Sequence, residues 1–454
     1  MSVVFVHVSD IHFGQEKGDS VHIHADVKRE LIFDAKAVIS SIVNGVAKGI
    51  LVTGDIAQSG TTAEYRAAGM WLDELAANIG VENHCVQMVP GNHDLDRSKL
   101  SIGGEAILNY IRAGDTKEYE DVLNNPTDRA TLYARFEDYD DFSFGYNCPL
   151  NGEGYYASEM EVNLAPGRAI RFIRFNSALL CHGEEGDEQP ELIIGARQFT
   201  IPRSEGVENV ILVHHPLHWY KDKELVRDYI RSRARVFISG HEHNPKVTVE
   251  TVEEGCDLLM IAAGATVPYK SDDEYTFTYN IIEFDWDEKL DGLSVTMHPR
   301  AWNPRRTRFE DDPNRLGGKE PNFRLACPNF RNTEQSPLHL IIQPAVPLVT
   351  EPDLSHSMPI IEVTSIVFDG GVKLMQPIQE GYEKARLRFF RDLFEGERIR
   401  ILVALDALSE DSNERMSQGL ERRLFDLLIR QGKLGEVERM IEQTILERKN
   451  GANQ

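Results

Sequence analysis

Five short segments of the chain carry side chains that can bind metal ions or transfer protons. Each segment directly follows an apolar run, so each stands where a strand would leave the core. Carboxylates, an amide and imidazoles without a thiolate suit Mn²⁺, Fe²⁺ or Zn²⁺ better than Ca²⁺ or Mg²⁺. The candidates are Asp10 and His12 in SDIH, Asp55 in TGD, Asn92, His93 and Asp94 in PGNHD, His214 and His215 in HHP, and His241 and His243 in GHEH.

Taken singly, each segment also has an ordinary structural explanation. Asp10 could be a turn carboxylate, Gly54-Asp55 is a common turn dipeptide, and Asn92 could cap a helix. Their joint occurrence at five strand ends favours a metal site, because function gathers at the carboxyl ends of strands in open α/β sheets. Seven ligands are too many for one such ion, but they suit two ions about 3.5–4 Å apart that share a carboxylate.

The elements that must position these side chains follow from the hydrophobic pattern. Residues 3–8, 50–55 and 84–94 are typical of buried strands with their exit loops. Apolar residues at helical spacing predict helices over 26–47 and 61–79. This alternation predicts βαβ units and a largely parallel sheet.

Further apolar runs predict the remaining strands. Polar and partly helical residues 96–150 are typical of an inserted cap rather than of sheet. Strands are expected over 169–177, 209–216, 234–243 and 257–265, and antiparallel closing strands over 274–284 and 292–299.

The character of the chain changes after residue 332. Five prolines punctuate residues 332–359, which indicates a linker, and amphipathic helical patterns follow it. We therefore expect an α/β domain over 1–325 with a helical insert at 96–150, a proline-rich linker over 326–359 and a helical interaction domain over 360–454.

Composition narrows the possible partners and compartments. A net charge of −24 argues against a general electrostatic grip on nucleic acid or on an anionic membrane, although a local basic site or bound cations could hold a phosphate ester. Five scattered cysteines without a CxxC pair predict free thiols in a reducing cytoplasm. We see neither a secretory signal nor an apolar run near the ~20 residues of a membrane span, so we expect a cytoplasmic protein.

The motifs D-x-H, GD, GNHD, HHP and GHEH, in this order, resemble those of the calcineurin-like metallophosphoesterases over roughly residues 1–300. The resemblance implies a four-layer α/β/β/α sandwich, here with a C-terminal helical domain, that hydrolyses phosphoric esters at a dinuclear metal centre. The stretches GDIAQSGTTAEYRAAGMWLDEL, VPGNHD and HHP are most similar to the cyclic-nucleotide phosphodiesterase branch. The implied substrate is a cyclic nucleotide or another small nucleotide-like phosphodiester.

The resemblance also implies the metal ligands, position by position. It favours two divalent ions, with Mn²⁺ ahead of Fe or Zn, and a hydroxide between them that attacks phosphorus in line. In HHP the ligand stands two residues before the proline, so His215 is expected to be only a neighbour. The implied ligands are Asp10, His12 and His243 for the first ion, Asp55 as the bridge, and Asn92, His214 and His241 for the second.

The two residues after Asn92 receive catalytic roles by the same resemblance. His93 would not bind metal; it would face the phosphate and assist the leaving oxygen. Asp94 would orient the His93 imidazole, as carboxylates beside metal sites commonly do.

The C-terminal helices leave several functions open. The segment GLERRLFDLLIRQGKLGEVERMIEQ resembles death-like effector-associated adaptor bundles of bacterial conflict systems, which implies a protein partner. Self-association and a plain helical core are the alternatives. For the whole chain, a nuclease acting on DNA or RNA is the competing enzyme, and an effector recruited through its C-terminal helices is the competing class.

Other polar residues have ordinary explanations that we prefer. His22 and His24 could line a substrate entrance, but a helix start explains them. A distal phosphate could meet three basic residues, but surface solvation is the simpler interpretation. Those residues are Arg197, Lys221 and Lys223, and the pair Cys181-His182 stands where an active-site loop could lie.

Overall fold

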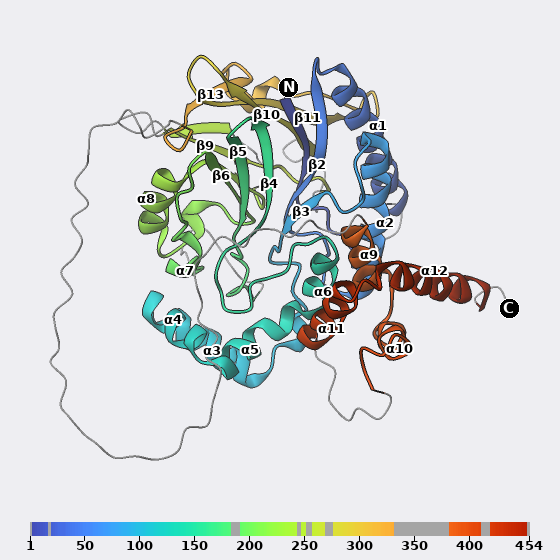
Figure 1. Cartoon of the computed structure of the whole chain (residues 1–454). Coiled ribbons are helices and arrows are strands. Elements are labelled where there is room, and N and C mark those ends of the chain that lie inside the picture. Colours follow the sequence, from blue (N-terminus) through green and yellow to red (C-terminus); the bar gives the residue numbers. More distant parts are fainter. Residues whose placement is uncertain are drawn as a thin grey trace, which may run out of the picture.

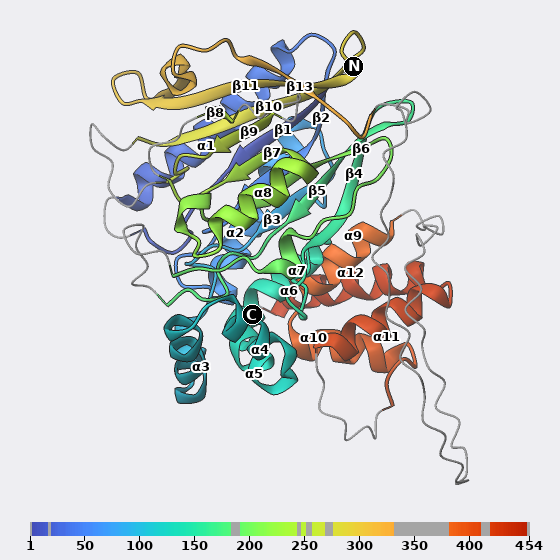
Figure 2. The same ribbon diagram turned by 90° about the vertical axis from the view of Figure 1, so that its left-hand side faces the viewer.

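The computed structural model of the chain describes residues 2–16, 20–182, 191–242, 247–250, 257–267, 276–330, 381–409 and 418–451. Within these ranges two β-sheets pack face to face between layers of helices (Figure 1), and in Figure 2 the left-hand side of that view faces the reader, so that the layers lie one behind another. The predicted four-layer α/β/β/α architecture with additional C-terminal helices is confirmed.

The first sheet combines parallel strands with antiparallel closing strands. Its strands are β1 (Ser2–Val8), β2 (Gly45–Thr53), β3 (Val86–Val89), β10 (Thr278–Asp287), β11 (Gly292–Asn303), β12 (Arg308–Asp311) and β13 (Asn322–Ala326). Their order is β12-β11-β10-β1-β2-β3, and β13 also pairs with β11. β1, β2 and β3 are parallel, whereas β10 and β11 are antiparallel as the sequence predicts.

The second sheet has the order β4-β5-β6-β7-β9-β8. Its strands are β4 (Ala157–Ala165), β5 (Arg168–Arg174), β6 (Val207–Val213), β7 (Ala234–Ser239), β8 (Val247–Glu250) and β9 (Leu258–Ala262). The inner strands β5, β6, β7 and β9 are parallel, and the two edge strands are antiparallel to their neighbours. The parallel strands therefore end together at one edge of the sheet.

Alternation along β1 shows how the layers are held. Val4 and Val6 pack in the core under the helices, whereas Val3 and Phe5 pack in the core between the two sheets. Successive side chains of a strand point to opposite faces, so an apolar run serves both cores. Phe5 meets Phe172 of the second sheet edge to face, with ring centroids 5.1 Å apart.

Two long helices, α1 (Ser20–Ser41) and α2 (Thr62–Ile79), cover the first sheet, and α7 (Ala196–Phe199) and α8 (Lys223–Arg233) belong to the layer outside the second (Figure 1). α1 ends earlier than the predicted 26–47, because Asn44 adopts a φ of 62° and the chain enters β2 at Gly45. α2 begins where predicted, since the Glu64 carboxylate accepts the Thr61 backbone N–H at 2.9 Å.

The insert forms four helices below the sheets, α3 (Ile102–Ala113), α4 (Thr116–Asn124), α5 (Pro126–Tyr133) and α6 (Glu137–Gly145) (Figure 1). Side-chain caps begin the first three of them, for example the Ser101 hydroxyl, which accepts the Gly104 N–H at 3.1 Å. Short 3-10 turns occupy Arg97–Lys99, Ala134–Phe136, Leu217–Trp219 and Pro313–Leu316.

The C-terminal helices build a small core of their own. They are α9 (Tyr382–Leu387), a π-helical turn over Arg388–Asp392, α10 (Glu395–Ala404), α11 (Gln418–Arg430) and α12 (Leu434–Gly451). Phe389, Phe425 and Leu428 are fully buried at its centre. The predicted amphipathic helices thus pack their apolar faces against one another.

These helices dock on α2 and α6 of the α/β domain (Figure 1). Arg391 pairs with both carboxylate oxygens of Asp73 in α2, at 2.6 and 2.9 Å. Arg422 donates to Asp140 in α6 at 2.6 Å, and the rings of Phe144 and Phe390 lie 4.4 Å apart. A cavity of about 810 Å³ lies beside this interface.

The described residues bear on two expectations, namely the absence of a membrane-spanning helix and the presence of free thiols. None of the helices in those ranges combines the length and apolar character needed to cross a bilayer. Cys85, Cys148, Cys181 and Cys327 are free thiols, and all but Cys85 are buried; Cys256 lies outside the described residues. Cys327 and Phe330 pack between the sheets, whereas most of the predicted linker falls in residues 331–380, which are not described.

Candidate metal centre

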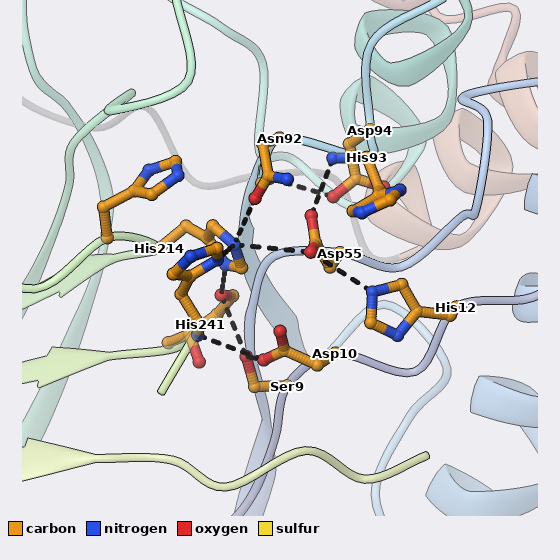
Figure 3. Close-up of polar contacts among 12 residues, drawn as sticks. Ser9, Asp10, His12, Asp55, Asn92, His93, Asp94, His214 and His241 are labelled. Carbon is orange, nitrogen blue, oxygen red and sulfur yellow. Dashed lines mark hydrogen bonds and ion pairs between the residues drawn. The ribbon is translucent and has the colours of Figure 1, made fainter. Parts of the chain in front are cut away.

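The loops after five strands converge at one edge of the sandwich (Figure 3). β1, β2 and β3 of the first sheet lead into the loops of Asp10, Asp55 and Asn92. β6 and β7 of the second sheet lead into those of His214 and His241. Because both sheets end their parallel strands here, the five loops can meet between them.

Asp55 lies at the centre of the cluster (Figure 3). Its Oδ2 lies 3.2 Å from His12 Nε2 and 3.5 Å from His214 Nε2, and its Oδ1 accepts the His93 backbone N–H at 2.8 Å. Burial alone would raise the pKa of this carboxyl, but His214 and His12 hold the pKa well below its usual range. Asp55 therefore stays ionised and attracts cations.

The hydrogen bonds of His214 fix which nitrogen faces the cluster. Its Nδ1 lies 2.7 Å from the Thr53 carbonyl and must donate to it. Its Nε2 then lies 3.1 Å from Asn92 Oδ1 and 3.2 Å from His241 Nδ1. Burial lowers the pKa of His214, but the Asp55 carboxylate outweighs burial and raises it to about 9. A cation binding at these atoms has to displace that proton.

Asp10 offers a second indication of a cation site. Its Oδ2 accepts the Ser9 hydroxyl at 2.5 Å and the His241 backbone N–H at 3.1 Å. Its Oδ1 is buried and has no hydrogen-bonding partner in the described part of the chain. A buried carboxylate oxygen without a donor is costly unless an ion satisfies it.

Two groups of potential ligand atoms overlap at Asp55. Within each group, the nitrogen or carboxylate atoms all lie within 4.8 Å of one another. The donor set of carboxylates, imidazoles and an amide oxygen fits two borderline divalent ions that share Asp55. The groups are Asp10, Asp55, His214 and His241, and His12, Asp55 and His93.

The backbone at these positions is strained. Residues with a Cβ rarely adopt positive φ, and such residues cluster at functional sites. Four of the predicted ligands nevertheless have left-handed backbones, Asp10 (φ 52°), His12 (φ 50°), Asp55 (φ 53°) and His241 (φ 64°).

Close packing of the loops explains one glycine of the PGNHD motif. A Cβ on Gly91 would lie 2.2 Å from Asp55 Oδ1 and 2.5 Å from the Asp55 backbone nitrogen. The loop that carries Asn92 can approach Asp55 only because residue 91 has no side chain.

His93 and Asp94 take different positions from each other. The His93 ring is partly exposed, lies 5.0 Å from the His12 ring, and places Nδ1 2.9 Å from the Gln58 carbonyl. Asp94 is fully buried and does not make the expected contact with that imidazole in the described structure. Its carboxylate instead accepts backbone N–H groups of Ile56, Ala57 and Gly91 at 2.9–3.1 Å.

The reason for this difference lies in burial and backbone geometry. Three amides converge on Asp94, and a buried carboxylate takes such donors before a ring that faces outward. Burial and the nearby Asp55 charge raise the pKa of Asp94 to about 6. Gln58 rather than Asp94 therefore positions the His93 ring.

Sequence reasoning missed the residues that support the ligands. Ser9 donates to Asp10, the Thr53 carbonyl orients His214, and Gln58 holds His93. Tyr65 of α2 donates its hydroxyl to the Asp94 carbonyl at 3.0 Å and to Asp94 Oδ1 at 3.2 Å. Ser9 and Gln58 stand next to recognisable motifs, whereas no sequence pattern links Tyr65 to residue 94.

His243 and His215 are the two remaining histidines of the motifs. His243 lies outside the described residues, so its predicted role as a ligand stays a prediction. His215 is fully buried, and its Nδ1 lies 2.9 Å from the Ser177 hydroxyl. Burial, followed by the neighbouring histidines, lowers its pKa well below the usual value. A neutral His215 beside His214 and His241 could also contribute a nitrogen ligand, because the three lie in one group.

Arg197, Lys221 and Cys181 have structural partners, and three of the other candidates lie at helix starts. His22 and His24 lie near the start of α1, and Lys223 begins α8. Arg197 pairs with Glu120 at 2.7 Å, and Lys221 donates to the Arg112 carbonyl at 2.8 Å. Cys181 is buried with its sulfur 3.8 Å from His215 Nε2.

Comparison with known families agrees with the fold and with this cluster. The calcineurin-like phosphoesterase family matches residues 3–245, more than half of the chain, and the chain belongs to this family. A second family, the GTPase-associated adaptor domain, matches residues 381–443, which include α9 to α11 and the start of α12. The C-terminal helices from residue 381 onward are thus similar to this family, and the name adaptor domain denotes these helices below.

Individual relatives are distant. The uncharacterized metallophosphoesterase-like protein YydB of Bacillus subtilis (strain 168) is 24% identical over 317 residues, covering 67% of this chain and 60% of YydB. A Vps29 single mutant from Entamoeba histolytica is 11% identical, with a TM-score of 0.30 over 68% of this chain and 98% of the other. A putative 5'-nucleotidase from Staphylococcus aureus is 12% identical, with a TM-score of 0.30 over 64% of this chain and 52% of the other.

Proposed function

We propose that the chain hydrolyses a phosphodiester at a two-metal centre built on Asp55. The observation that carries the proposal is the convergence of electron-pair donors around that carboxylate. His214 Nε2 lies 3.1 Å from Asn92 Oδ1 and 3.5 Å from Asp55 Oδ2. The Oδ1 of Asp10 has no hydrogen-bond donor in the described part of the chain. Such a set is stable only with protons or cations between its members.

The proposed metal ligands are those that the motifs name. Asp55 would be shared by the two positions, and Asn92, His214 and His241 would hold one of the ions. Asp10, which also lies in one group with His214 and His241, would hold the other ion together with His12, with His243 as a proposed member. Two bound cations would lower the pKa of a water and neutralise charge on the phosphate.

His93 is the proposed general acid. Its Nδ1 lies 2.9 Å from the Gln58 carbonyl, so this nitrogen carries a proton and Nε2 is the nitrogen left to act on a substrate. A protonated Nε2 can donate to the leaving oxygen of a phosphodiester. The partly exposed ring beside His12 is accessible to a substrate from solvent.

A small diester, such as a cyclic nucleotide, is the proposed substrate class. Two of the basic residues that could have held a longer anion are already engaged, Arg197 by Glu120 and Lys221 by carbonyls of the insert. The net charge of −24 also disfavours a long nucleic acid. The sequence likeness to cyclic-nucleotide phosphodiesterases supports the same class.

A substrate panel with added Mn²⁺ tests this proposal. It contains bis-p-nitrophenyl phosphate, the matching monoester, cyclic nucleotides, and single- and double-stranded DNA. We expect diester hydrolysis by the wild type that is lost in Asp55→Ala and in Asn92→Ala. Wild-type rates in both variants would refute the dinuclear mechanism, and preference for DNA would favour a nuclease.

We also propose that the adaptor domain recruits a protein partner that is associated with a GTPase. The name of the matched family supports this, and the domain contributes no cluster of potential metal ligands in the described residues. Binding of the full-length chain to GTPases that carry an adaptor domain of the same family, in GDP and GTP, tests it. Self-association in analytical ultracentrifugation, without such binding, would favour the dimer alternative.

A further inference from the structure

An uninterrupted series of contacts connects the adaptor domain with the loops of the metal centre. It begins at Arg391, which pairs with Asp73 of α2 and donates to the Tyr146 hydroxyl at 2.9 Å. Tyr146 is fully buried after α6, and its ring meets Phe142 with centroids 5.2 Å apart. The adaptor domain therefore touches the buried aromatic residues of the insert directly.

The next contacts lead from the insert into α2. Phe142 stacks on Tyr65, with centroids 4.9 Å apart and ring planes at 22°. Both rings are almost completely buried. Close-packed aromatic side chains cannot move independently, so the position of Phe142 constrains that of Tyr65.

The series ends at Asp94, which holds both metal-site loops. The Tyr65 hydroxyl donates to Asp94 Oδ1 at 3.2 Å and to its carbonyl at 3.0 Å. The same carboxylate accepts the amides of Ile56 and Ala57, next to Asp55, and that of Gly91, next to Asn92. One carboxylate thus sets the distance between the proposed bridging ligand and the amide ligand.

We propose that Tyr65 and Asp94 are positioning residues that transmit docking of the adaptor domain to the metal centre. This deepens the proposed function and rests on it, because the centre has to bind metal for its geometry to matter. When Arg391 holds α2 and the insert together, Tyr65 supports Asp94 and the two loops stay in register. When that contact is lost, Tyr65 can shift and the ligands separate.

A purely structural role is the competing explanation, and the design separates the two. Tyr65→Phe and Tyr146→Phe each remove one hydroxyl and keep the ring, so the packing survives. Arg391→Ala removes the docking contact, with Arg391→Lys as the conservative rescue. Arg422→Ala is the matched control, because Arg422 also pairs across the domain interface, with Asp140, but lies outside the series.

The readouts are the Mn²⁺ concentration for half-maximal diester hydrolysis, and kcat and KM, measured on the full chain. We expect Tyr65→Phe and Arg391→Ala each to raise that concentration roughly three- to tenfold and to lower kcat, with KM unchanged. Arg391→Lys should recover part of the loss. In the double variant Tyr65→Phe/Tyr146→Phe, the increase in the Mn²⁺ concentration should be smaller than the product of the increases in the two single variants.

The control sets the contradicting outcome. Arg422→Ala should change the Mn²⁺ concentration for half-maximal hydrolysis less than twofold. In the double variant with Tyr65→Phe, the two fold-changes should multiply. Equal effects of Arg422→Ala and Arg391→Ala, or a normal Mn²⁺ requirement in folded Tyr65→Phe, would overturn the proposal. If Arg391→Ala does not fold, Arg391→Lys and Tyr146→Phe decide the question.

The same experiment remains informative if the proposed function fails. Mn²⁺ binding by calorimetry gives a second readout that does not depend on a substrate. A wild type that binds Mn²⁺ but hydrolyses no ester on the panel would refute the proposed function alone. Normal Mn²⁺ affinity in Tyr65→Phe, beside an active wild type, would refute the positioning role alone.

Discussion

Asn92 and His93 are neighbours in one loop, yet their surroundings differ. Asn92 is buried with its Oδ1 3.1 Å from His214 Nε2, whereas the His93 ring is partly exposed. One position suits a metal ligand and the other suits a group that meets the substrate. This difference leads to separable effects of substitution.

Asn92→Ala should empty one metal position, and His93→Ala should keep both. Alanine at 92 removes a ligand oxygen, so metal content after Mn²⁺ loading should fall from near two ions per chain to near one. Alanine at 93 removes the proposed acid, so kcat should fall by roughly 10²–10⁴ at full metal content. Elemental analysis beside steady-state kinetics checks both, and metal loss in His93→Ala would contradict the division.

Gly91→Ala should disable the centre although it replaces none of the proposed ligands. Its Cβ would lie 2.2 Å from Asp55 Oδ1, so the loop has to move. We expect a loss of roughly 1–3 kcal/mol in stability and of most Mn²⁺ binding. Thermal melting and calorimetry measure these, with Gly152→Ala as control because its Cβ would meet nothing within 4 Å. Equal behaviour of the two variants would contradict the packing argument.

For single residues, the sequence predicts the metal ligands better than the residues that position those ligands. The loops of Asp10, Asp55, Asn92 and His214 come together because each follows a parallel strand, which the apolar runs reveal. The partners of Asp94 could not be predicted, since they depend on how the backbone of residues 56 and 57 turns beside residue 91. Tyr65 reaches Asp94 only through the packing of α2.

At the scale of elements, α6 meets the adaptor domain through acidic residues. Asp141 lies 3.6 Å from Arg398 and is partly buried. Burial raises its pKa to about 6, more than the opposing arginines lower it. This carboxyl binds its proton more tightly in the folded than in the unfolded chain.

The sign of its effect on stability follows from that difference. A raised carboxyl pKa favours the folded state at low pH, and this contribution is lost as pH rises from about 4 to about 6. The loss is at most about 3 kcal/mol. Asp141→Asn cannot ionise, so its stability relative to the wild type should increase over that range. Urea unfolding at pH 4 and pH 7 checks this, and a constant difference would contradict it.

Central elements could be predicted more reliably than edges. β1, β2, β5 and β6 are apolar runs buried on both faces, and the sequence locates them. The edge strands β4, β8, β12 and β13 escaped prediction, because half-exposed strands carry mixed residues without a clear period. The division of the strands into two sheets also depends on pairing that no local pattern encodes.

At the scale of the molecule, the α/β domain and the adaptor domain are proposed as separate units joined by a proline-rich linker. Their contacts include the Arg391–Asp73 and Arg422–Asp140 pairs and the Phe144–Phe390 ring contact. These contacts join side chains of the two units directly.

Cleavage in the linker should therefore leave the two parts associated. After cleavage at a protease site introduced into the predicted linker, residues 326–359, the fragments should co-elute in size-exclusion chromatography. Arg391→Ala together with Arg422→Ala should weaken their association after cleavage, since two of the bridging ion pairs are removed. Fragments of the unaltered chain that elute apart would contradict a stable docked arrangement.

The left-handed backbones of Asp10, His12, Asp55 and His241 have an evolutionary consequence. Each such conformation costs a residue with a Cβ about 1–2 kcal/mol, and glycine would remove that cost. Asp10→Gly should thus melt at a higher temperature than Asp10→Ala, although both lose the carboxylate. A related protein that no longer needed the metal centre would become more stable if glycine replaced the residues at these four positions. The Asp and His side chains are therefore retained there at the expense of stability.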